Sequence, residues 1–207
     1  MANKDLAIYC GCMERVRQHM SVVETVRAGR IDTRHRDLNQ ELVFLHLRKA
    51  LEEIAFSSLA ANREKYSAVR AEFAKDWNAK RLLKGIAKVN PQFWPIPVTG
   101  PQEIAPGRKH FDRVKDGFLT QEELAELYDD ASAMELHLPN PYAPADRPAA
   151  REYSVEGWSA RIKALLRLHA VKLVDVHGLW VVRVYNGGPV EAITAMTDGD
   201  FVVEPPS

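Results

Sequence analysis

The placement of proline constrains the fold of this chain more than any other feature of its sequence. None of its 12 prolines lies in residues 1–90, whereas nine lie from Pro91 to Pro148 and three lie after that. Proline lacks a backbone N–H, and its ring clashes with the preceding helical turn, so it interrupts helices. The first 90 residues are therefore free to fold as helices, and the middle of the chain is not.

Apolar side chains recur with helical spacing in this first part. A helix is predicted from about Lys4 to Arg27, with a stop at Gly29, and a second from about Asp37 to Asn62. The apolar stripe of the first helix contains Leu6, Tyr9, Met13, Val16, Met20 and Val23. The wider apolar face of the second contains Phe44, Leu47, Leu51, Ile54, Ala55 and Ser58, extended by Leu45, Phe56 and Leu59. We expect the second helix to lie centrally in a bundle.

Four more helices are predicted beyond these two. Two shorter ones cover residues 65–75 and the segment from Trp77 to the residues before Pro91. Thr120 and Glu123 fit a capping box that begins a helix running to about residue 136. Ser154 is the expected N-cap of a last helix, which ends near residue 167.

The remaining segments indicate loops and strands. Residues 91–118 are rich in proline and also carry aromatic residues, so we predict an ordered, extended loop that lies across the bundle. After His169 the pattern changes to a period of two with β-branched residues, interrupted by glycine turns. The segments VKLVDVH, LWVVRVYN, VEAITAM and FVVE predict an antiparallel meander of three or four strands.

These elements predict an α+β protein of 207 residues. Residues 1–169 form a helical bundle domain that includes the proline-rich ordered loop 91–118, and residues 170–207 form an antiparallel β-meander packed on it. No apolar run reaches the roughly 18 residues that a transmembrane helix needs. The N-terminus lacks the layout of a signal peptide, and two cysteines do not make a disulfide framework. We therefore expect a cytoplasmic protein with no membrane partner.

The charge of the chain is balanced overall but not locally. Lys and Arg together number 28, as do Asp and Glu, yet residues 1–90 hold 17 basic and 11 acidic residues, and residues 91–207 hold 11 and 17. Such a split predicts either two halves that attract each other or a basic face for a partner. Dedicated nucleic-acid binders usually carry an overall positive charge, so a nucleic acid is a weakly supported partner.

Arg48 and Glu52 are the first candidate binding residues. They are four residues apart inside the apolar arc of the second helix, and Glu41 lies on the same stripe, so both should be partly buried. Buried charges need partners. The pair is an internal ion pair, an arginine whose stem packs while its head reaches out, or part of a ligand site. By contrast, the stripe of His46, Lys49, Glu53 and Ser57 is typical of an ordinary polar face.

His137, Asn140 and Tyr142 form the second candidate binding cluster. They lie in the segment LHLPNPY at the end of the acidic helix, where a histidine can cap helix carbonyls and interact with the helix dipole. The alternative is a polar site in a loop, since binding residues are often found in loops.

Other chemical motifs are incomplete. DRVKDGFLTQEE, from Asp112 to Glu123, resembles a calcium loop but has Val114 where a ligand oxygen is needed and lacks an incoming helix. Cys10 and Cys12 are two residues apart, so on a helix they point to opposite sides and make a poor zinc pair with His19. Signatures of nucleophilic catalysis, phosphate-binding loops and dinucleotide binding do not occur. We therefore predict no metal and no cofactor, and catalytic residues stay unassigned.

Residues 4–142 resemble the HEPN-like group of bacterial proteins. The resemblance rests on the long opening helix, on the helix LVFLHLRKALEEIAFSSL and on a later helix ending in LHLPNPY. Active HEPN proteins are metal-independent ribonucleases whose Arg-x4-6-His motif forms a composite site in a dimer. No arginine precedes His137 at that spacing, and the one match runs from Arg30 to His35 in a linker. The resemblance thus implies the fold rather than the nuclease.

The function predicted from these observations is that of a non-catalytic binding or accessory module with a HEPN-like helical core. We expect a homodimer or a protein partner. One alternative is an RNA-cleaving toxin or defence-type ribonuclease that uses Arg30 and His35, or His137 with an arginine from elsewhere. The other is a small-molecule sensor that binds its ligand around Arg48 and Glu52.

Overall fold

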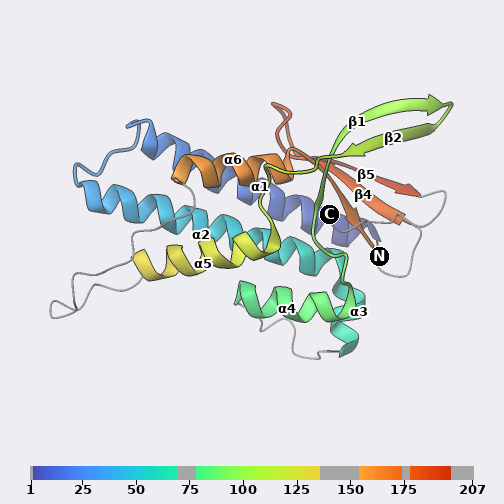
Figure 1. Cartoon of the computed structure of the whole chain (residues 1–207), viewed down its shortest axis with the longest axis horizontal. Coiled ribbons are helices and arrows are strands. Elements are labelled where there is room, and N and C mark those ends of the chain that lie inside the picture. Colours follow the sequence, from blue (N-terminus) through green and yellow to red (C-terminus); the bar gives the residue numbers. More distant parts are fainter. Residues whose placement is uncertain (1, 70–77, 136–153, 174–177, 197–207) are drawn as a thin grey trace.

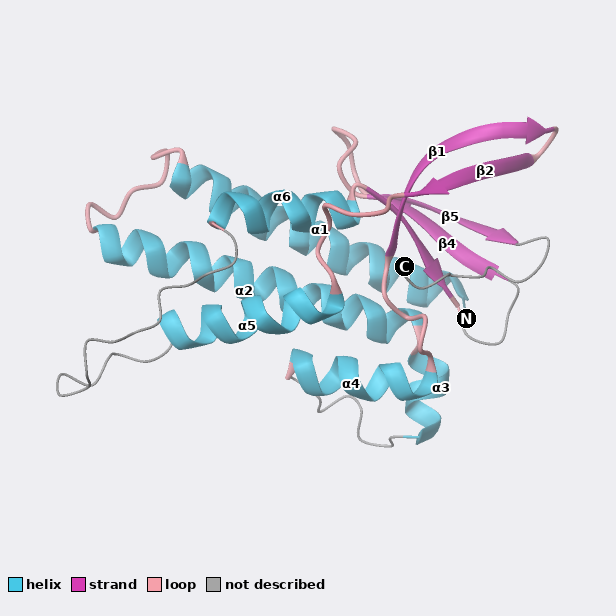
Figure 2. Ribbon diagram, in the orientation of Figure 1, coloured by secondary structure: helices cyan, strands magenta, loops and turns pink. Residues whose placement is uncertain are grey.

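The computed structural model describes residues 2–69, 78–135, 154–173 and 178–196. In these ranges it contains six helices and a five-stranded antiparallel sheet, which confirms a mainly helical α+β fold. The long helices lie along the long axis of the molecule, and the strands gather at one end (Figure 1, Figure 2). Within the described ranges, none of the helices combines the length and apolar character needed to cross a bilayer.

Helix α2 occupies the centre of the bundle, as its wide apolar face predicts. It contacts α1, α3, α4 and α5. The helices are α1 (Ala2–Arg27), α2 (Arg36–Ala61), α3 (Arg63–Val69), α4 (Ala79–Val89), α5 (Gln121–Glu135) and α6 (Val155–Leu166). Helix α1 ends before Gly29, whose positive φ of 67° reverses the chain. The predicted first, second, fourth, fifth and last helices are thus confirmed to within a few residues, while part of the third falls outside the described residues.

Two assignments on the surface of α2 were wrong. Leu45 was expected to extend the apolar face, but it is 37% exposed. Ser57 was placed on the polar face, yet it is fully buried. Its hydroxyl donates a hydrogen bond to the carbonyl of Ile54 at 2.7 Å, which satisfies the polar group inside the helix and lets this position pack in the interior.

Both predicted helix caps are present. The backbone N–H of Thr120 donates to Glu123 Oε2 at 2.9 Å, and the N–H of Glu123 donates to Thr120 Oγ1 at 3.2 Å. These reciprocal bonds form the capping box of α5, with Leu119 and Leu124 buried on either side of it. At the start of α6, Ser154 Oγ accepts a hydrogen bond from the N–H of Gly157 at 3.2 Å.

Replacing the cap of α6 gives a first test of this structure. Ser154→Ala leaves the Gly157 N–H without its side-chain acceptor, so we expect the free energy of unfolding to fall by about 1 kcal/mol. Ser154→Asp keeps an acceptor oxygen and should leave stability within about 0.5 kcal/mol of the original chain. Urea denaturation of both variants checks this. Equal losses in the two variants would contradict the capping role.

The sheet has the strand order β2-β1-β3-β4-β5. Its strands are β1 (Ile96–Ala105), β2 (Arg108–Arg113), β3 (Leu168–Lys172), β4 (Gly178–Arg183) and β5 (Glu191–Met196). Strands β3, β4 and β5 form the predicted C-terminal meander, and the fourth predicted segment, FVVE, lies outside the described residues. Strands β1 and β2 come from the segment that was predicted to be a loop, so that prediction was wrong.

The β1–β2 hairpin accommodates its prolines at positions where a sheet tolerates them. Strand β1 pairs with β3 only at Ile96 and Pro97, and its remainder pairs with β2. Pro101 sits at an irregularity of the β1–β2 register, between Thr99 and Gln102, where a lost N–H breaks no ladder hydrogen bond. Asp112 lies in β2, opposite Thr99, so a strand stands where a calcium loop would need its incoming helix.

The sheet contributes to two hydrophobic clusters. One face packs against the helices through Val171, Trp180 and Val182, which belong to the main core of the bundle. Side chains on the other face, including Ile96, Ala170 and Val181, form a second and smaller cluster. His169, at the start of β3, is fully buried and bonded to α1, so it ties the sheet to the bundle.

Candidate functional site

Arg48 and Glu52 form the predicted ion pair, and the structure adds Tyr128 to it. Arg48 Nε lies 3.2 Å from Glu52 Oε1, and the two side chains are 17% and 26% exposed. Arg48 Nη2 donates to the hydroxyl of Tyr128 at 3.1 Å, and this hydroxyl donates to Glu52 Oε1 at 3.1 Å. The guanidinium also lies over the Tyr128 ring, 4.8 Å from its centre. The three groups thus satisfy one another across the α2–α5 contact.

The chemistry of this network is structural. Burial, with the Glu52 carboxylate alongside, raises the pKa of Tyr128, so the phenol keeps its proton and stays a hydrogen-bond donor. Each charge faces its opposite, and Arg48 adds a cation–π contact. The network therefore joins α2 to α5, which favours the internal ion pair among the interpretations of these residues.

A small cavity lies beside Arg48. Its volume is about 290 Å³, and it is lined by Thr33, Leu38, Glu41, Leu42, Leu45, Arg48 and Ala131. Glu41, the third charged residue of the predicted stripe, thus shares the cavity with Arg48. His137, Asn140 and Tyr142 lie outside the described residues, so the second predicted cluster is not placed relative to this cavity.

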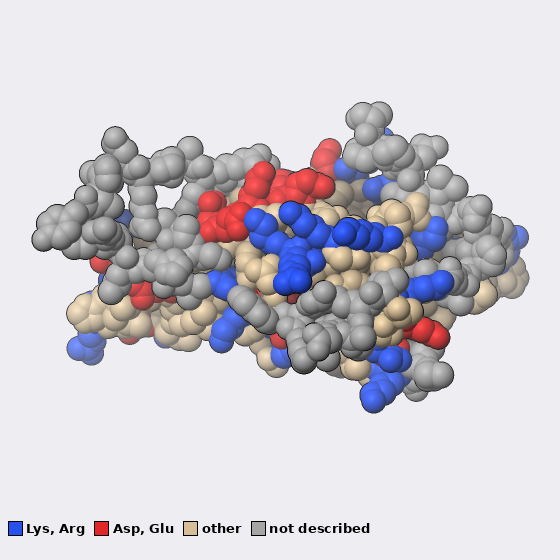
Figure 3. Space-filling model, turned by 90° about the horizontal axis from the view of Figure 1, so that it is seen from below, with Lys and Arg blue, Asp and Glu red and all other residues tan. Residues whose placement is uncertain are grey.

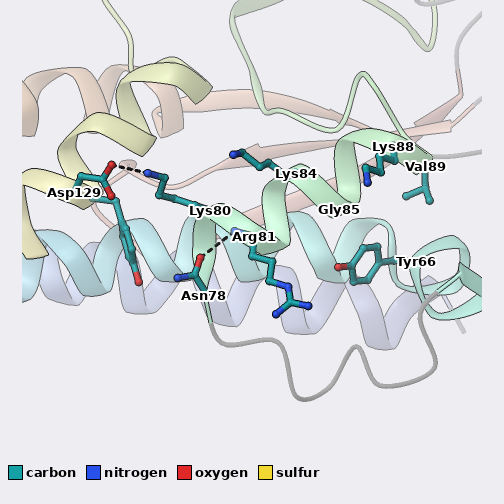
Figure 4. A pocket seen from close by; sticks show the side chains of 10 residues that line it. Tyr66, Asn78, Lys80, Arg81, Lys84, Gly85, Lys88, Val89 and Asp129 are labelled. Atoms are coloured by element: carbon teal, nitrogen blue, oxygen red, sulfur yellow. Dashed lines mark hydrogen bonds and ion pairs between the residues drawn. The ribbon is translucent and has the colours of Figure 1, made fainter.

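A larger groove runs along α4 and includes Tyr128 of α5 in its lining. It has a volume of about 950 Å³. Its lining residues are Tyr66, Asn78, Lys80, Arg81, Lys84, Gly85, Lys88, Val89, Tyr128 and Asp129. Figure 4 shows the basic side chains along α4, with Tyr66 near one end of the helix and Asp129 beyond the other.

The strong amphipathic character of α4 explains why cations line this groove. Leu82, Leu83 and Ile86 are buried against the bundle, so the polar positions between them point outward. Gly85 lets Tyr66 approach closely, because a Cβ at that position would lie 2.5 Å from the Tyr66 hydroxyl oxygen. The floor of the groove is thus a close contact of α3 with α4, and its rim is basic.

The basic residues of the groove differ in whether a carboxylate neutralises them. Lys80 forms an exposed ion pair with Asp129 of α5. Among the residues that the structure describes, no carboxylate lies within ion-pair distance of Arg81, Lys84 or Lys88. Lys84 and Lys88 are exposed. A groove with three unneutralised cations attracts anionic groups.

Acidic residues of α5 lie beside this basic groove. Glu122, Glu126 and Asp129 are exposed, and Asp130 is half-buried. In the described residues, Glu122, Glu126 and Asp130 have no basic partner within ion-pair distance. In the view from below the bundle, Lys and Arg side chains form one patch and Asp and Glu side chains a second patch directly next to it (Figure 3). This face of the molecule is therefore bipolar.

A third polar cluster lies between α1 and α2. His19 Nδ1 and His46 Nδ1 are 2.9 Å apart, so one ring donates a hydrogen bond to the other. Burial lowers the pKa of both imidazoles, and Lys49 contributes to the effect on His19. One helical turn away, Arg15 Nε bonds Glu53 Oε1 at 2.6 Å. His46 and Glu53 were predicted to belong to an ordinary polar face, but both side chains bond to residues of α1.

The two cysteines of α1 differ in burial but both keep their protons. Cys12 is 2% exposed, and burial together with the nearby Glu53 raises the pKa of its thiol to about 12. Burial also raises the pKa of Cys10. Both side chains therefore remain thiols at neutral pH, which makes them poor nucleophiles. Among the described residues, no three His, Cys, Asp or Glu side chains converge in a way that could hold a metal ion.

Arg30 and His35, the residues of the ribonuclease alternative, lie in the linker between α1 and α2. Both are exposed. His35 is the N-cap residue of α2, although its side chain makes no capping hydrogen bond. The linker is fixed instead by Asp32 Oδ1, which accepts hydrogen bonds from the Arg34 N–H at 2.9 Å and from Asn39 Nδ2 at 2.7 Å.

The groove on α4 is the feature that reasoning from sequence missed. Its signal was present, because Lys80, Lys84 and Lys88 repeat every four residues and so form one row on a helix. Comparisons of the chain with protein-family models, with curated proteins and with solved structures give no match. The resemblance to HEPN-like proteins stays a prediction.

Proposed function

We propose that this chain is a non-catalytic binding module and that the groove along α4 binds an anionic ligand. The observation that carries the proposal is the set of unneutralised cations, Arg81, Lys84 and Lys88, on the rim of a groove of about 950 Å³. At the other candidate site, the Arg48–Glu52–Tyr128 network favours a structural role, because each of its groups is engaged by the other two.

The groove favours carboxylates or phosphates that follow one another along a chain. Lys80, Lys84 and Lys88 lie on one side of α4 and repeat about every 6 Å along its axis. Such a row matches a ligand with several negative charges better than a single ion. Lysine is a flexible point charge that does not impose the planar geometry of arginine, so the row selects charge more than shape.

Charge reversal at two positions tests this proposal. Lys84→Glu with Lys88→Glu should weaken binding of fluorescein-labelled poly-L-glutamate by at least about 10-fold, because the ligand then meets like charges. A single-stranded RNA of similar length forms a second arm and distinguishes carboxylates from phosphates. Fluorescence anisotropy at low salt and low protein concentration measures both.

A matched control comes from the sheet end of the molecule. Lys109 and Lys115 are exposed and do not line the α4 groove. The double change Lys109→Glu and Lys115→Glu alters the net charge by the same amount and should leave binding within about 2-fold of the original. Equal weakening in both double variants would mean that net charge, and not the groove, attracts the probe. Absence of binding to either probe would refute the proposal.

A further inference from the structure

We infer that His19 and His46 bind one divalent first-row transition-metal ion, such as Ni²⁺, where α1 meets α2. Neither residue lines the α4 groove, so this inference goes beyond the proposed function and does not depend on it. Imidazole nitrogens are good ligands for zinc, copper, iron and nickel ions. The two rings face each other through their Nδ1 atoms, which are 2.9 Å apart.

The distance between these nitrogens matches that of neighbouring ligands on one ion. A metal–imidazole bond is about 2.0–2.1 Å long, so two nitrogens that subtend an angle of about 90° at the ion are about 2.9 Å apart. A tetrahedral angle separates them by about 3.3 Å. The two ring centres are 5.1 Å apart. That value lies within the range of about 4.5–5.3 Å that these two angles produce, so a tilt of the rings directs both lone pairs at one ion.

The packing of the two helices holds both rings in place. His19 and His46 lie 27 residues apart in the sequence, so only the folded chain brings them together. Each directly precedes a residue of the main core, and these residues, Met20 and Leu47, are 1% and 0% exposed. The ligands are thus preorganised, and binding does not have to order the chain. Both imidazoles are only half-buried, so water can reach the remaining positions around the ion.

The protonation of the pair favours metal binding. A histidine binds a metal through a neutral imidazole. Burial lowers the pKa of both His19 and His46, so both rings are neutral at about pH 7.5. In the structure one Nδ1–H donates a hydrogen bond to the other Nδ1. When that proton moves to Nε2 of its own ring, both Nδ1 lone pairs become available to the ion, and no net proton is released.

Charged neighbours determine how tightly the ion is held. Lys49 lowers the pKa of both imidazoles, so it is close enough to repel a bound cation. Arg15 has the same effect on His19, but its Nε bonds Glu53 Oε1 at 2.6 Å, which compensates its charge. With two protein ligands instead of the four of a structural zinc site, binding should be weak and exchangeable.

Calorimetric titration with Ni²⁺ tests the site in a chain without a polyhistidine tag, at about pH 7.5. His19→Ala and His46→Ala should each weaken binding at least about 10-fold, because a single imidazole loses the advantage of two linked ligands. His35 and His110 are exposed and belong to neither ring pair. The double variant His35→Ala with His110→Ala is therefore the control, and it should bind within about 2-fold of the unchanged chain.

Removing the charge of Lys49 gives the opposite effect. Lys49→Gln should strengthen Ni²⁺ binding at least about 2-fold, because a repulsive charge near the ion is lost. Lys115→Gln, at an exposed position on the sheet side, alters the net charge equally and should leave binding unchanged. A histidine pair with a purely structural role would give no such difference between the two variants.

The inference is overturned if Ni²⁺ does not bind, or if His19→Ala and His46→Ala bind it as tightly as the unchanged chain. Should either variant fail to fold, NMR spectra of the unchanged chain decide the question. Added Ni²⁺ should then shift or broaden the imidazole signals of His19 and His46 before those of the other histidines. An equal effect on all histidine signals would contradict the site.

Discussion

Acidification from about pH 7 to about pH 4 is expected to remove about 3 kcal/mol of stability through His169 alone. His169 is fully buried, and burial lowers the pKa of its imidazole to about 4. In the unfolded chain the same group titrates near its ordinary pKa of about 6.5. As the pH falls between these two values, the unfolded chain takes up a proton that the folded chain does not, so unfolding becomes easier.

The contacts of His169 explain why its folded form stays neutral. Its Nδ1 lies 3.2 Å from the carbonyl oxygen of Leu166, so this nitrogen carries the proton and donates it in a hydrogen bond. Its Nε2 carries no proton and accepts a hydrogen bond from the hydroxyl of Tyr9 at 2.8 Å. Burial raises the pKa of Tyr9, which therefore remains a donor. The bond connects α1 to β3, so protonation strains the junction of bundle and sheet.

Urea denaturation at pH 7, 5.5 and 4 measures this effect in the unchanged chain and in His169→Gln. The variant lacks the titrating group, so its loss of stability on acidification should be smaller by about 3 kcal/mol, whatever its stability at pH 7. His19 and His46, whose pKa values are also lowered by burial, are retained in both proteins and cancel in the difference. His110→Gln, at an exposed position, is the control. Parallel losses in His169→Gln and in the unchanged chain would contradict the prediction.

The long helices could be predicted because their burial follows local spacing. The apolar stripe of α1 from Tyr9 to Val23 and the centre of the α2 face from Phe44 to Ser58 are buried as expected, since residues three or four positions apart share a helix side. The hairpin of residues 96–113 could not be predicted from the sequence, because its prolines argue against strands unless a register irregularity accommodates them. That irregularity depends on pairing with distant residues, which a single sequence does not reveal.

The candidate site was predictable only in its local part. Arg48 and Glu52 are one helical turn apart, so their pairing follows from sequence, but Tyr128 lies 76 residues beyond Glu52 and joins them through helix packing. The α4 groove depends in the same way on α3 and α5 supplying its walls. His46 was assigned to a polar face because the side of α2 that meets α1 carries polar as well as apolar side chains.

Removing the guanidinium of Arg161 is expected to lower the free energy of unfolding by about 3 kcal/mol. Arg161 Nε donates to Glu123 Oε2 at 3.1 Å, and Arg161 Nη2 donates to Glu123 Oε1, so the pair is bidentate. The two side chains are only 17% and 13% exposed. Arg161→Met keeps the apolar stem and leaves a largely buried carboxylate without its cation, which is costly in a medium of low dielectric constant.

The double variant Arg161→Met with Glu123→Gln separates charge from packing. Glutamine is neutral, so the double variant has no unpaired buried charge at this position. The amide oxygen of glutamine can still accept the hydrogen bond that the Thr120 N–H donates to Glu123 Oε2 at 2.9 Å. Chemical denaturation should therefore show the double variant to be more stable than Arg161→Met alone, even though it carries one more substitution. That order follows only if the unpaired carboxylate causes most of the loss. If the double variant is the less stable of the two, the pair contributes mainly through packing and the electrostatic explanation is wrong.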